Sequence, residues 1–178
     1  MNQMLAQVKA LQDYVSTISG YPFQAAGGCV RDALWERIPK DYDMVYCPGD
    51  ISDSEAFTMI AELAKTFRIL GWRVAVYQAY GTRADGAVSE SSFESMFFAC
   101  LKIDGENLPS VDILLSKYSG LDEHISHHDC NANMVYLTPG GEVVGCVRPT
   151  VLLFRDGIEG SRIEYMTNKY NVILAEDK

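Results

Sequence analysis

A chain of 178 residues is long enough for one compact domain with a sizeable hydrophobic core. Hydrophobic residues make up 48% of it and charged residues 22%, which excludes the disordered and fibrous classes. Fifteen Lys and Arg residues oppose 24 Asp and Glu residues, and the net charge of −9 excludes non-specific binding of long nucleic acid, because that affinity comes from neutralising phosphates. Any nucleic-acid substrate must therefore be held by a local basic patch or by a partner.

The sequence contains no pattern that directs it to a membrane or to an oxidising compartment. Its apolar runs are too short for a transmembrane helix, and its first residues lack the basic and apolar segments of a signal peptide. Five cysteines at irregular spacing, without a Cys-x-x-Cys pair, indicate reduced thiols. We therefore expect a cytoplasmic protein that makes no membrane contact.

The first part of the chain alternates helical and extended patterns. Apolar residues at three- and four-residue spacing predict a helix over residues 2–18, which a Gly-Tyr-Pro turn ends. The elements expected next are a short buried strand at 23–26, a helix at about 30–35 and a strand at 41–46.

The rest of the chain continues this alternation. Ser52 and Glu55 have the spacing of a capping box, which predicts a helix from there to Gly71. Alternating residues predict a strand over 72–77, and small polar residues predict a mobile loop over 81–92. The elements expected after it are strands at 93–103 and 111–115, a hairpin of strands 134–137 and 143–147, and a helix at 162–171. This order predicts one α/β domain in which helices flank a mixed β-sheet.

One short window of the chain concentrates residues that suit the handling of a nucleoside triphosphate. A Gly-Gly pair lets the backbone approach a phosphate chain closely, and basic side chains nearby could neutralise it. Asp41 and Asp43 are separated by one residue, so on a strand they point to the same face. Two carboxylates on one face are the core of a two-magnesium phosphoryl- or nucleotidyl-transfer site. The candidate phosphate-binding residues are Gly27, Gly28, Arg31 and Lys40.

The same window resembles the motif of the class II tRNA nucleotidyltransferases and bacterial poly(A) polymerases, a family within the DNA polymerase β superfamily. That motif runs Gly-Gly-x-Val-Arg-Asp, a short helix ending in Arg-x-Pro-Lys-Asp, then x-Asp, and each part is present in order between Gly27 and Asp43. The resemblance implies the polymerase β-like nucleotidyltransferase fold. It also implies an enzyme that binds two Mg²⁺ ions and takes a nucleoside triphosphate as substrate.

The resemblance extends to a third carboxylate on a neighbouring strand. Asp112 lies within an apolar Val-Asp-Ile-Leu-Leu segment, where an acid is costly to bury unless it is paired or binds metal. The family has a similar strand with a basic residue five positions after the acid, and Lys117 holds that position. Residues 81–82, Gly-Thr, resemble another element of the same sheet. The resemblance thus assigns nucleotide binding to Lys117, and catalysis and metal binding to Asp41, Asp43 and Asp112.

A second segment resembles the Arg-Arg-Asp-x-x-x-Asn-Ala motif of the same family. Asp129 and Asn133 match it by type and spacing, whereas His127 and His128 replace the two arginines. The arginines would contact the phosphates or ribose of the nucleotide. A histidine can still donate one hydrogen bond, but it is charged only when the bound anion raises its pKa. We expect from this replacement an activity that falls with rising pH.

The resemblance covers the catalytic head, about residues 20–150, and leaves 151–178 as a short C-terminal extension where the family has helical neck, body and tail regions. The whole chain, 1–178, is therefore expected to be a single head domain. The expected reaction moves a nucleoside monophosphate from the triphosphate to an acceptor hydroxyl, an RNA or tRNA 3′ end, with release of pyrophosphate. The alternatives are transfer to a protein or small-molecule hydroxyl, and a non-catalytic nucleotide sensor or interaction module.

The candidate residues also have simpler structural interpretations. Arg31 and Asp32 could form a surface salt bridge at an ordinary strand-to-helix turn, the paired acids could lie on a solvated turn, and Asp112 could be a buried acid paired with an arginine. The three histidines and Cys130 could suggest zinc, but no second pair of ligands accompanies them, so no zinc is expected. A patch for an RNA 3′ end, or simply solvated positions, could be formed by Arg148, Arg155 and Arg162.

Overall fold

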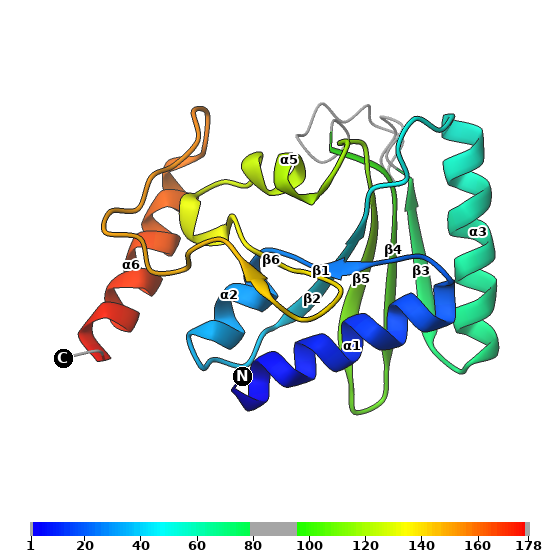
Figure 1. Cartoon of the computed structure of the whole chain (residues 1–178), viewed down its shortest axis with the longest axis horizontal. Helices are drawn as coiled ribbons and strands as arrows, with labels where there is room; N and C mark the ends of the chain where they lie inside the picture. The colour runs from blue at the N-terminus through cyan, green and yellow to red at the C-terminus, as the bar shows by residue number, and fades with distance from the viewer. Residues whose placement is uncertain (1, 79–95, 177–178) are drawn as a thin grey trace.

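The computed structural model describes residues 2–78 and 96–176, and its main feature is a five-stranded sheet in the order β1-β2-β5-β4-β3. Strands β2 and β5 are parallel, and the other neighbouring pairs are antiparallel. The sheet is therefore mixed, and helices flank it (Figure 1), which confirms the predicted α/β class. The strands are β1 (Gln24–Ala25), β2 (Asp41–Tyr46), β3 (Arg73–Gln78), β4 (Phe97–Gly105) and β5 (Leu108–Ser116).

Some expected elements lie outside the described residues. They are the mobile loop over 81–92, the Gly-Thr pair at 81–82 and the start of the strand expected from residue 93. The helices of the described part are α1 (Gln3–Ser19), α2 (Gly28–Leu34), α3 (Asp53–Ile69), α5 (Leu121–Ser126) and α6 (Gly160–Glu176). None of these helices is both long and apolar enough to cross a membrane.

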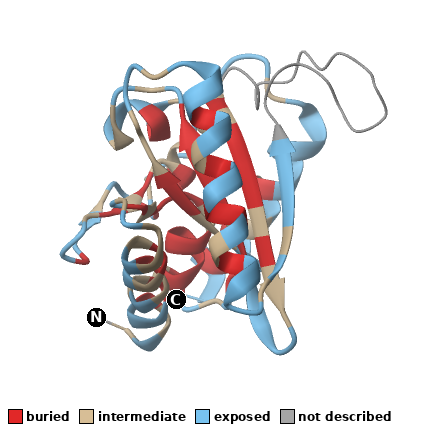
Figure 2. Ribbon diagram, turned by 90° about the vertical axis from the view of Figure 1, so that its right-hand side faces the viewer, coloured by how far each residue is buried: buried red, intermediate tan, exposed pale blue. Residues whose placement is uncertain are grey.

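The two faces of the sheet have different surroundings because side chains alternate along each strand. On one face Met44, Ile113 and Leu101 lie in register on adjacent strands and belong to the main core, with apolar residues of α1 and α3. Asp43 and Asp112 alternate with them and therefore lie on the opposite face. Figure 2 shows the buried residues concentrated in the strands and on the helix faces turned toward them.

Helices α1 and α3 both begin with a side-chain cap. The Asn2 side chain accepts the Leu5 N–H and begins α1, which ends at Gly20 with a left-handed φ of 79°. The predicted capping box of α3 is present between Ser52 and Glu55. One buried polar residue of α1, Gln12, accepts the Ala25 N–H at 2.7 Å and so ties this helix to β1.

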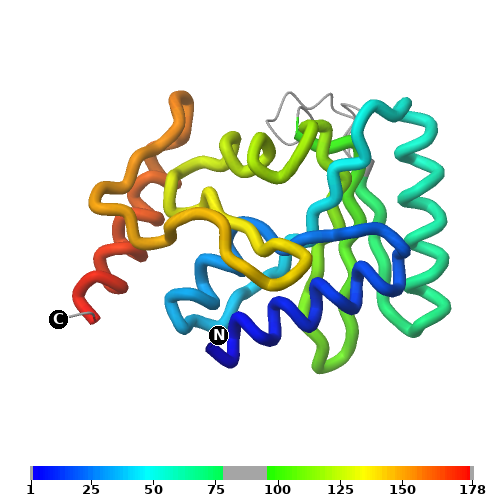
Figure 3. Tube along the Cα trace, in the orientation of Figure 1, coloured from blue at the N-terminus to red at the C-terminus, as the bar shows by residue number. Residues whose placement is uncertain are grey.

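The chain after α5 runs back past α2 before it enters α6 (Figure 3). The expected hairpin is present but shorter, as β6 (Tyr136–Leu137) and β7 (Val143–Val144), and α6 is longer than the helix expected at 162–171. Trp35 beside α2 stacks on Tyr170 of α6 with ring centroids 5.9 Å apart, and its indole N–H donates to the Val147 carbonyl at 2.9 Å. These contacts hold α6 against the segment that carries the Gly-Gly pair.

Candidate active site

Three aspartates lie on the same face of the sheet. In the parallel pairing of β2 with β5, Asp43 is directly opposite Asp112, and Asp41 is two residues earlier on β2. The carboxyl groups of Asp43 and Asp112 are therefore neighbours across the sheet, and the negative charge of Asp112 acts on Asp43. Burial, followed by the negative charge of Asp112, raises the pKa of Asp43 well above its ordinary value. The two carboxyl groups therefore need a shared proton or a cation between them.

Lys102 is the cationic neighbour of these acids in the sheet. It lies opposite Asp112 in the antiparallel pairing of β4 with β5, with Nζ 3.8 Å from Asp112 Oδ1. The charge of Asp112 raises the pKa of Lys102. One cation beside three carboxylates leaves this face net negative.

The chemistry of the acids fits a hard divalent cation. Their donors are all carboxylate oxygens, which Mg²⁺ prefers, and the strand register places two of them directly opposite each other. In the positions described, no three Asp, Glu, His or Cys side chains within 2–78 and 96–176 converge on one metal-binding point. Asp43 and Asp112 could hold such an ion after small side-chain rotations, with Asp41 beside them.

Gly27 shapes the pocket wall next to the acids. Its φ of 73° and ψ of −135° are available to glycine but strained for other residues. A Cβ at this position would lie 3.2 Å from Cε1 of His128, closer than ordinary contacts. The Gly27 N–H donates to the Val135 carbonyl at 2.8 Å, so it is already satisfied within the protein. Gly28 follows as the first residue of α2.

Arg31 lines the pocket, and its guanidinium also has partners within the protein. Its guanidinium is buried, donates to Asp32 at 2.9 Å and to the side-chain oxygen of Asn133, and lies over the Trp35 ring. Asn133 in turn donates to Asp129 at 2.6 Å. The structure therefore indicates that Arg31 orients Asn133, and its expected contact with phosphate stays a prediction.

Helix α6 closes this network at two points. Arg162 pairs with Asp129, and Lys169 Nζ lies 3.2 Å from Asp32 Oδ1. The Arg162 and Asn133 side chains, which both donate to Asp129, lower the pKa of its carboxyl group and keep it ionised. Two residues expected to contact the ribose are thus held in place by a helix outside the resemblance.

The two histidines that replace arginines have different surroundings. His128 Nδ1 lies 2.6 Å from the Asn133 carbonyl oxygen, and burial lowers the pKa of His128. A carbonyl oxygen only accepts, so Nδ1 carries the proton and Nε2 of the neutral ring is an acceptor. This differs from the expected role of His128 as a donor to the nucleotide. His127 has its Nδ1 2.9 Å from the Glu123 carbonyl and stacks on Tyr118.

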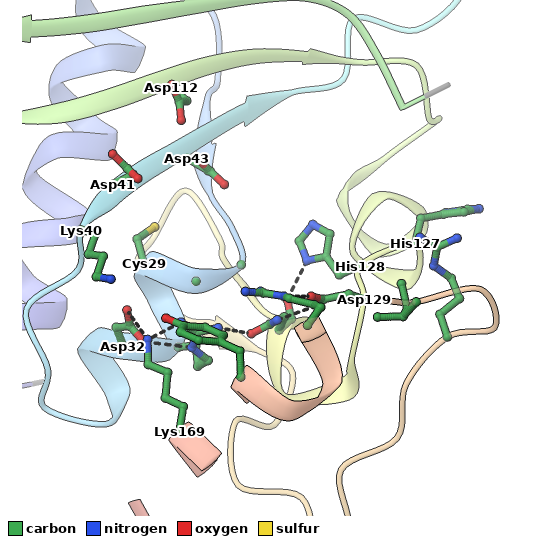
Figure 4. A pocket seen from close by; sticks show the side chains of 18 of the residues that line it. Cys29, Asp32, Lys40, Asp41, Asp43, Asp112, His127, His128, Asp129 and Lys169 are labelled. Atoms are coloured by element: carbon green, nitrogen blue, oxygen red, sulfur yellow. Dashed lines mark hydrogen bonds and ion pairs between the residues drawn. The ribbon is translucent and has the colours of Figure 1, made fainter. Parts of the chain in front are cut away.

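One pocket of about 520 Å³ brings most of the candidates together (Figure 4). In the close-up the three acids lie on one side of it, while His127, His128 and Asp129 lie on another. Lys117 is not among the residues that line the pocket, and its Nζ lies over the Phe98 ring at 5.7 Å. The candidates that line the pocket are Gly27, Gly28, Arg31, Lys40, Asp41, Asp43, Asp112, His127, His128, Asp129 and Asn133.

The pocket also contains Tyr165 and Lys169, which sequence reasoning did not assign to the site, and two arginines that it considered for an RNA 3′ end. Arg162, Tyr165 and Lys169 of α6 form part of its wall, and Arg155 lies on the segment that leads to this helix. In α6 the three residues are separated by three and then four positions, which puts them on one helical face. This shared face could be predicted from the sequence once a helix was expected there. What the pattern did not indicate is that this face turns toward the Gly-Gly segment.

Solved structures of other proteins share this architecture. The sequence matches no protein-family model and no curated protein. Solved structures share the α/β polymerase β-like fold that the sequence predicted. They are CCA-adding enzymes, among them the Thermotoga maritima enzyme complexed with tRNA, with 17% identity and a TM-score of 0.50 over 82% of this chain.

Two further structures of CCA-adding enzymes agree with this. An apo form has 16% identity and a complex with CTP has 17%, each with a TM-score of 0.51 over 82% of this chain. The chain spans about 30% of the length of each of these enzymes. At this identity the likeness concerns the fold of one part of those proteins.

Proposed function

We propose that this protein is a metal-dependent nucleotidyltransferase, which moves a nucleoside monophosphate from a nucleoside triphosphate to an acceptor hydroxyl and releases pyrophosphate. The observation that carries the proposal is the register of β2 and β5. It brings Asp43 opposite Asp112 in the same pocket as the Gly-Gly pair and Lys40. The fold shared with part of the CCA-adding enzymes supports the same reaction class.

The acids would hold the metal ions. Two Mg²⁺ ions held by Asp41, Asp43 and Asp112 would supply Lewis-acid stabilisation of the charge on the phosphate oxygens. Asp112 would accept the proton of the acceptor hydroxyl, whose oxygen attacks the α-phosphorus while the bond to pyrophosphate breaks. Burial raises the pKa of Asp112, and the charge of Lys102 beside it would oppose that rise.

The remaining pocket residues would bind the nucleotide. Lys40 is exposed and lies on the pocket wall next to Asp41, where it would neutralise the triphosphate. Gly27 and Gly28 would let the phosphates approach the backbone without a Cβ between them. Asp129 would accept a hydrogen bond from the ribose, and its position depends on Asn133.

We propose an RNA 3′ end, such as that of tRNA, as the acceptor. The solved structures with the same fold include a CCA-adding enzyme complexed with tRNA, which supports this class of substrate. With a net charge of −9, the protein would depend on local cations to hold the strand, and Arg155 and Arg162 at the pocket are suited to that. We further propose that residues 1–178 act as one head domain and that the reaction takes place in the cytoplasm.

The test is transfer of label from each α-labelled nucleoside triphosphate to total RNA and total protein in the presence of Mg²⁺. Asp41→Asn and Asp43→Asn should reduce transfer at least about a thousandfold, since each removes a negatively charged metal ligand. Asp50→Asn is the matched control, because Asp50 is an exposed acid on the loop after β2 and does not line the pocket.

The acceptor that takes the label distinguishes the possibilities. Labelled RNA supports the proposal in full, whereas labelled protein or small molecules would keep the reaction and replace the acceptor. Full activity in either pocket variant would refute the assignment of the acids. A magnesium-dependent rise in melting temperature with a triphosphate, but no transfer to any acceptor, would identify a nucleotide sensor instead.

A further inference from the structure

Tyr118 and His127 form a stacked pair at the edge of the pocket. Their ring centroids are 4.1 Å apart and their planes differ by 12°. Tyr118 follows the end of β5, the strand that carries Asp112, and His127 follows the end of α5. Both rings are half-buried, so part of each surface remains open to solvent.

Hydrogen bonds and ring contacts fix the orientation of the pair. His127 Nδ1 donates to the Glu123 carbonyl at 2.9 Å, since a carbonyl oxygen can only accept. The Tyr118 N–H donates to the Ser116 hydroxyl at 3.2 Å, and the edge of its ring meets His124 at 5.9 Å. The two rings therefore need little ordering when a flat ligand binds to them.

Only one ring of the pair faces the pocket. His127 lines it, whereas Tyr118 does not. Because Tyr118 covers one face of the imidazole, His127 presents its remaining surface to the pocket. In the close-up His127 lies across the pocket from Asp41, on the side that also carries His128 and Asp129 (Figure 4). A ligand with phosphates at the acids would thus extend toward this ring.

Arg155 places a positive charge next to the pair. Its backbone N–H donates to the Asp129 carbonyl at 2.9 Å, its side chain lines the pocket, and its charge acts on both Tyr118 and His128. Arg162 of the same wall is paired with Asp129. Arg155, by contrast, makes no ion pair with any carboxylate in the part of the chain that the structure describes. Its guanidinium is therefore available for an anion of the substrate.

We propose that the imidazole of His127, backed by Tyr118, is a stacking platform for a nucleobase, and that Arg155 binds a phosphate of the same substrate. An aromatic surface beside a cation is the combination that binds unpaired nucleotides, and it tolerates different bases because each base has a flat π-face. The proposal rests on the proposed function and deepens it. Tyr118 acts through His127 and is a positioning residue.

The base could belong to the incoming nucleotide or to the strand end that receives it, and binding measurements separate the two. One arm compares ATP with ribose 5-triphosphate, both carrying a methylene bridge between the α- and β-phosphorus, in the presence of Mg²⁺. The other arm compares a short single-stranded RNA ending in cytidine with the same RNA ending in an abasic ribose. In each arm the ratio of the two dissociation constants measures what the base contributes.

In the wild-type protein we expect a ratio of about ten or more in one arm, which is what stacking of one base provides. His127→Ala should bring that ratio close to one, and Tyr118→Leu should reduce it, while Tyr118→Phe, which keeps the ring, should retain it. Arg155→Gln should raise the dissociation constants of both ligands of that arm by the same factor. Arg68→Gln on the exposed face of α3 is the control for loss of one positive charge.

The outcomes separate this proposal from the proposed function. A wild-type ratio that His127→Ala and Tyr118→Leu leave unchanged would overturn the platform, provided that both variants melt cooperatively. A wild-type ratio near one in both arms would overturn it as well, while leaving nucleotidyl transfer intact. Failure of the wild-type protein to bind any of the four ligands would refute the proposed function itself.

Discussion

His124 is a buried histidine whose charge state should control the acid stability of the fold. Only 1% of the residue is exposed, and its Nδ1 lies 2.9 Å from the Ser116 hydroxyl oxygen. That oxygen accepts the Tyr118 N–H, so its own proton is available to Nδ1. Burial first, and the neighbouring histidines second, lower the pKa of His124 to about 3. Protonation of Nδ1 would also remove the hydrogen bond from the hydroxyl.

The sign and size of the effect follow from linkage. In the unfolded chain a histidine has a pKa of about 6.5, so below that pH the unfolded state binds a proton that the folded state does not. The contribution to stability is fully present above pH 6.5 and is lost as the pH falls toward 3. The loss is about 1.4 kcal/mol for each pH unit, or about 2 kcal/mol between pH 6.5 and pH 5.

The assay is urea unfolding of the wild-type protein and of His124→Gln at pH 7.5 and at pH 5.0. The amide of glutamine can accept from Ser116 but does not titrate in this range. Other acidic groups contribute equally to both proteins, so the difference between the two pH dependences isolates His124. We expect the wild type to lose about 2 kcal/mol more than the variant on acidification. Equal losses, within about 0.5 kcal/mol, would refute the reasoning.

Three further substitutions test the local structure, each by urea unfolding. Gly27→Ala should destabilise the protein by about 2 kcal/mol more than Gly20→Ala. Both positions have positive φ, but only at Gly27 would a Cβ lie against a neighbouring imidazole. Equal losses of stability would contradict the close contact. Asp32→Asn should cost about 3 kcal/mol or more by leaving the buried Arg31 guanidinium without its carboxylate, and a loss below about 1 kcal/mol would show that the pair is solvated. Ser52→Ala should cost about 1 kcal/mol through loss of the capping box, and an unchanged midpoint would argue against that cap.

The sequence predicted best those parts of the structure that depend on local patterns. The spacing of Asp41 and Asp43 predicted that both acids lie on one face, because side chains on a strand repeat every two residues, and both lie on β2 as expected. The capping box of α3 is a contact over three residues, which sequence alone contains. The fold class follows from the order of such elements, so it could be predicted without knowing how they pack.

The parts that could not be predicted depend on which surfaces meet in three dimensions. The hydrogen bond from the Arg31 guanidinium to Asn133 joins residues 102 positions apart, so no local pattern contains it. Lys117 matched the family by its position five residues after Asp112, but it lies beyond the end of β5, over the Phe98 ring, and does not line the pocket. The role of α6 as a pocket wall likewise arises from its docking on Trp35, which no local pattern contains.

Whether the matched residues perform chemistry is a separate question from where they lie. The roles of the pocket residues, including Lys40 and Asp129, are predictions that the transfer assay tests. His128 illustrates why location is not enough, since its burial leaves a neutral acceptor where the resemblance suggested a donor.

The parallel pairing of β2 with β5 has a consequence for how the protein is made. Strands β3, β4 and β5 follow one another as antiparallel neighbours, whereas β2 must wait for β5 across all of α3, β3 and β4. Pairings between distant segments form slowly, because the intervening chain must first be ordered. A nascent chain leaving the ribosome therefore exposes the Gly-Gly segment and the first two acids well before Asp112 emerges. Throughout that interval β2 can pair with β1 but lacks β5, and only completion of the sheet brings the three acids together.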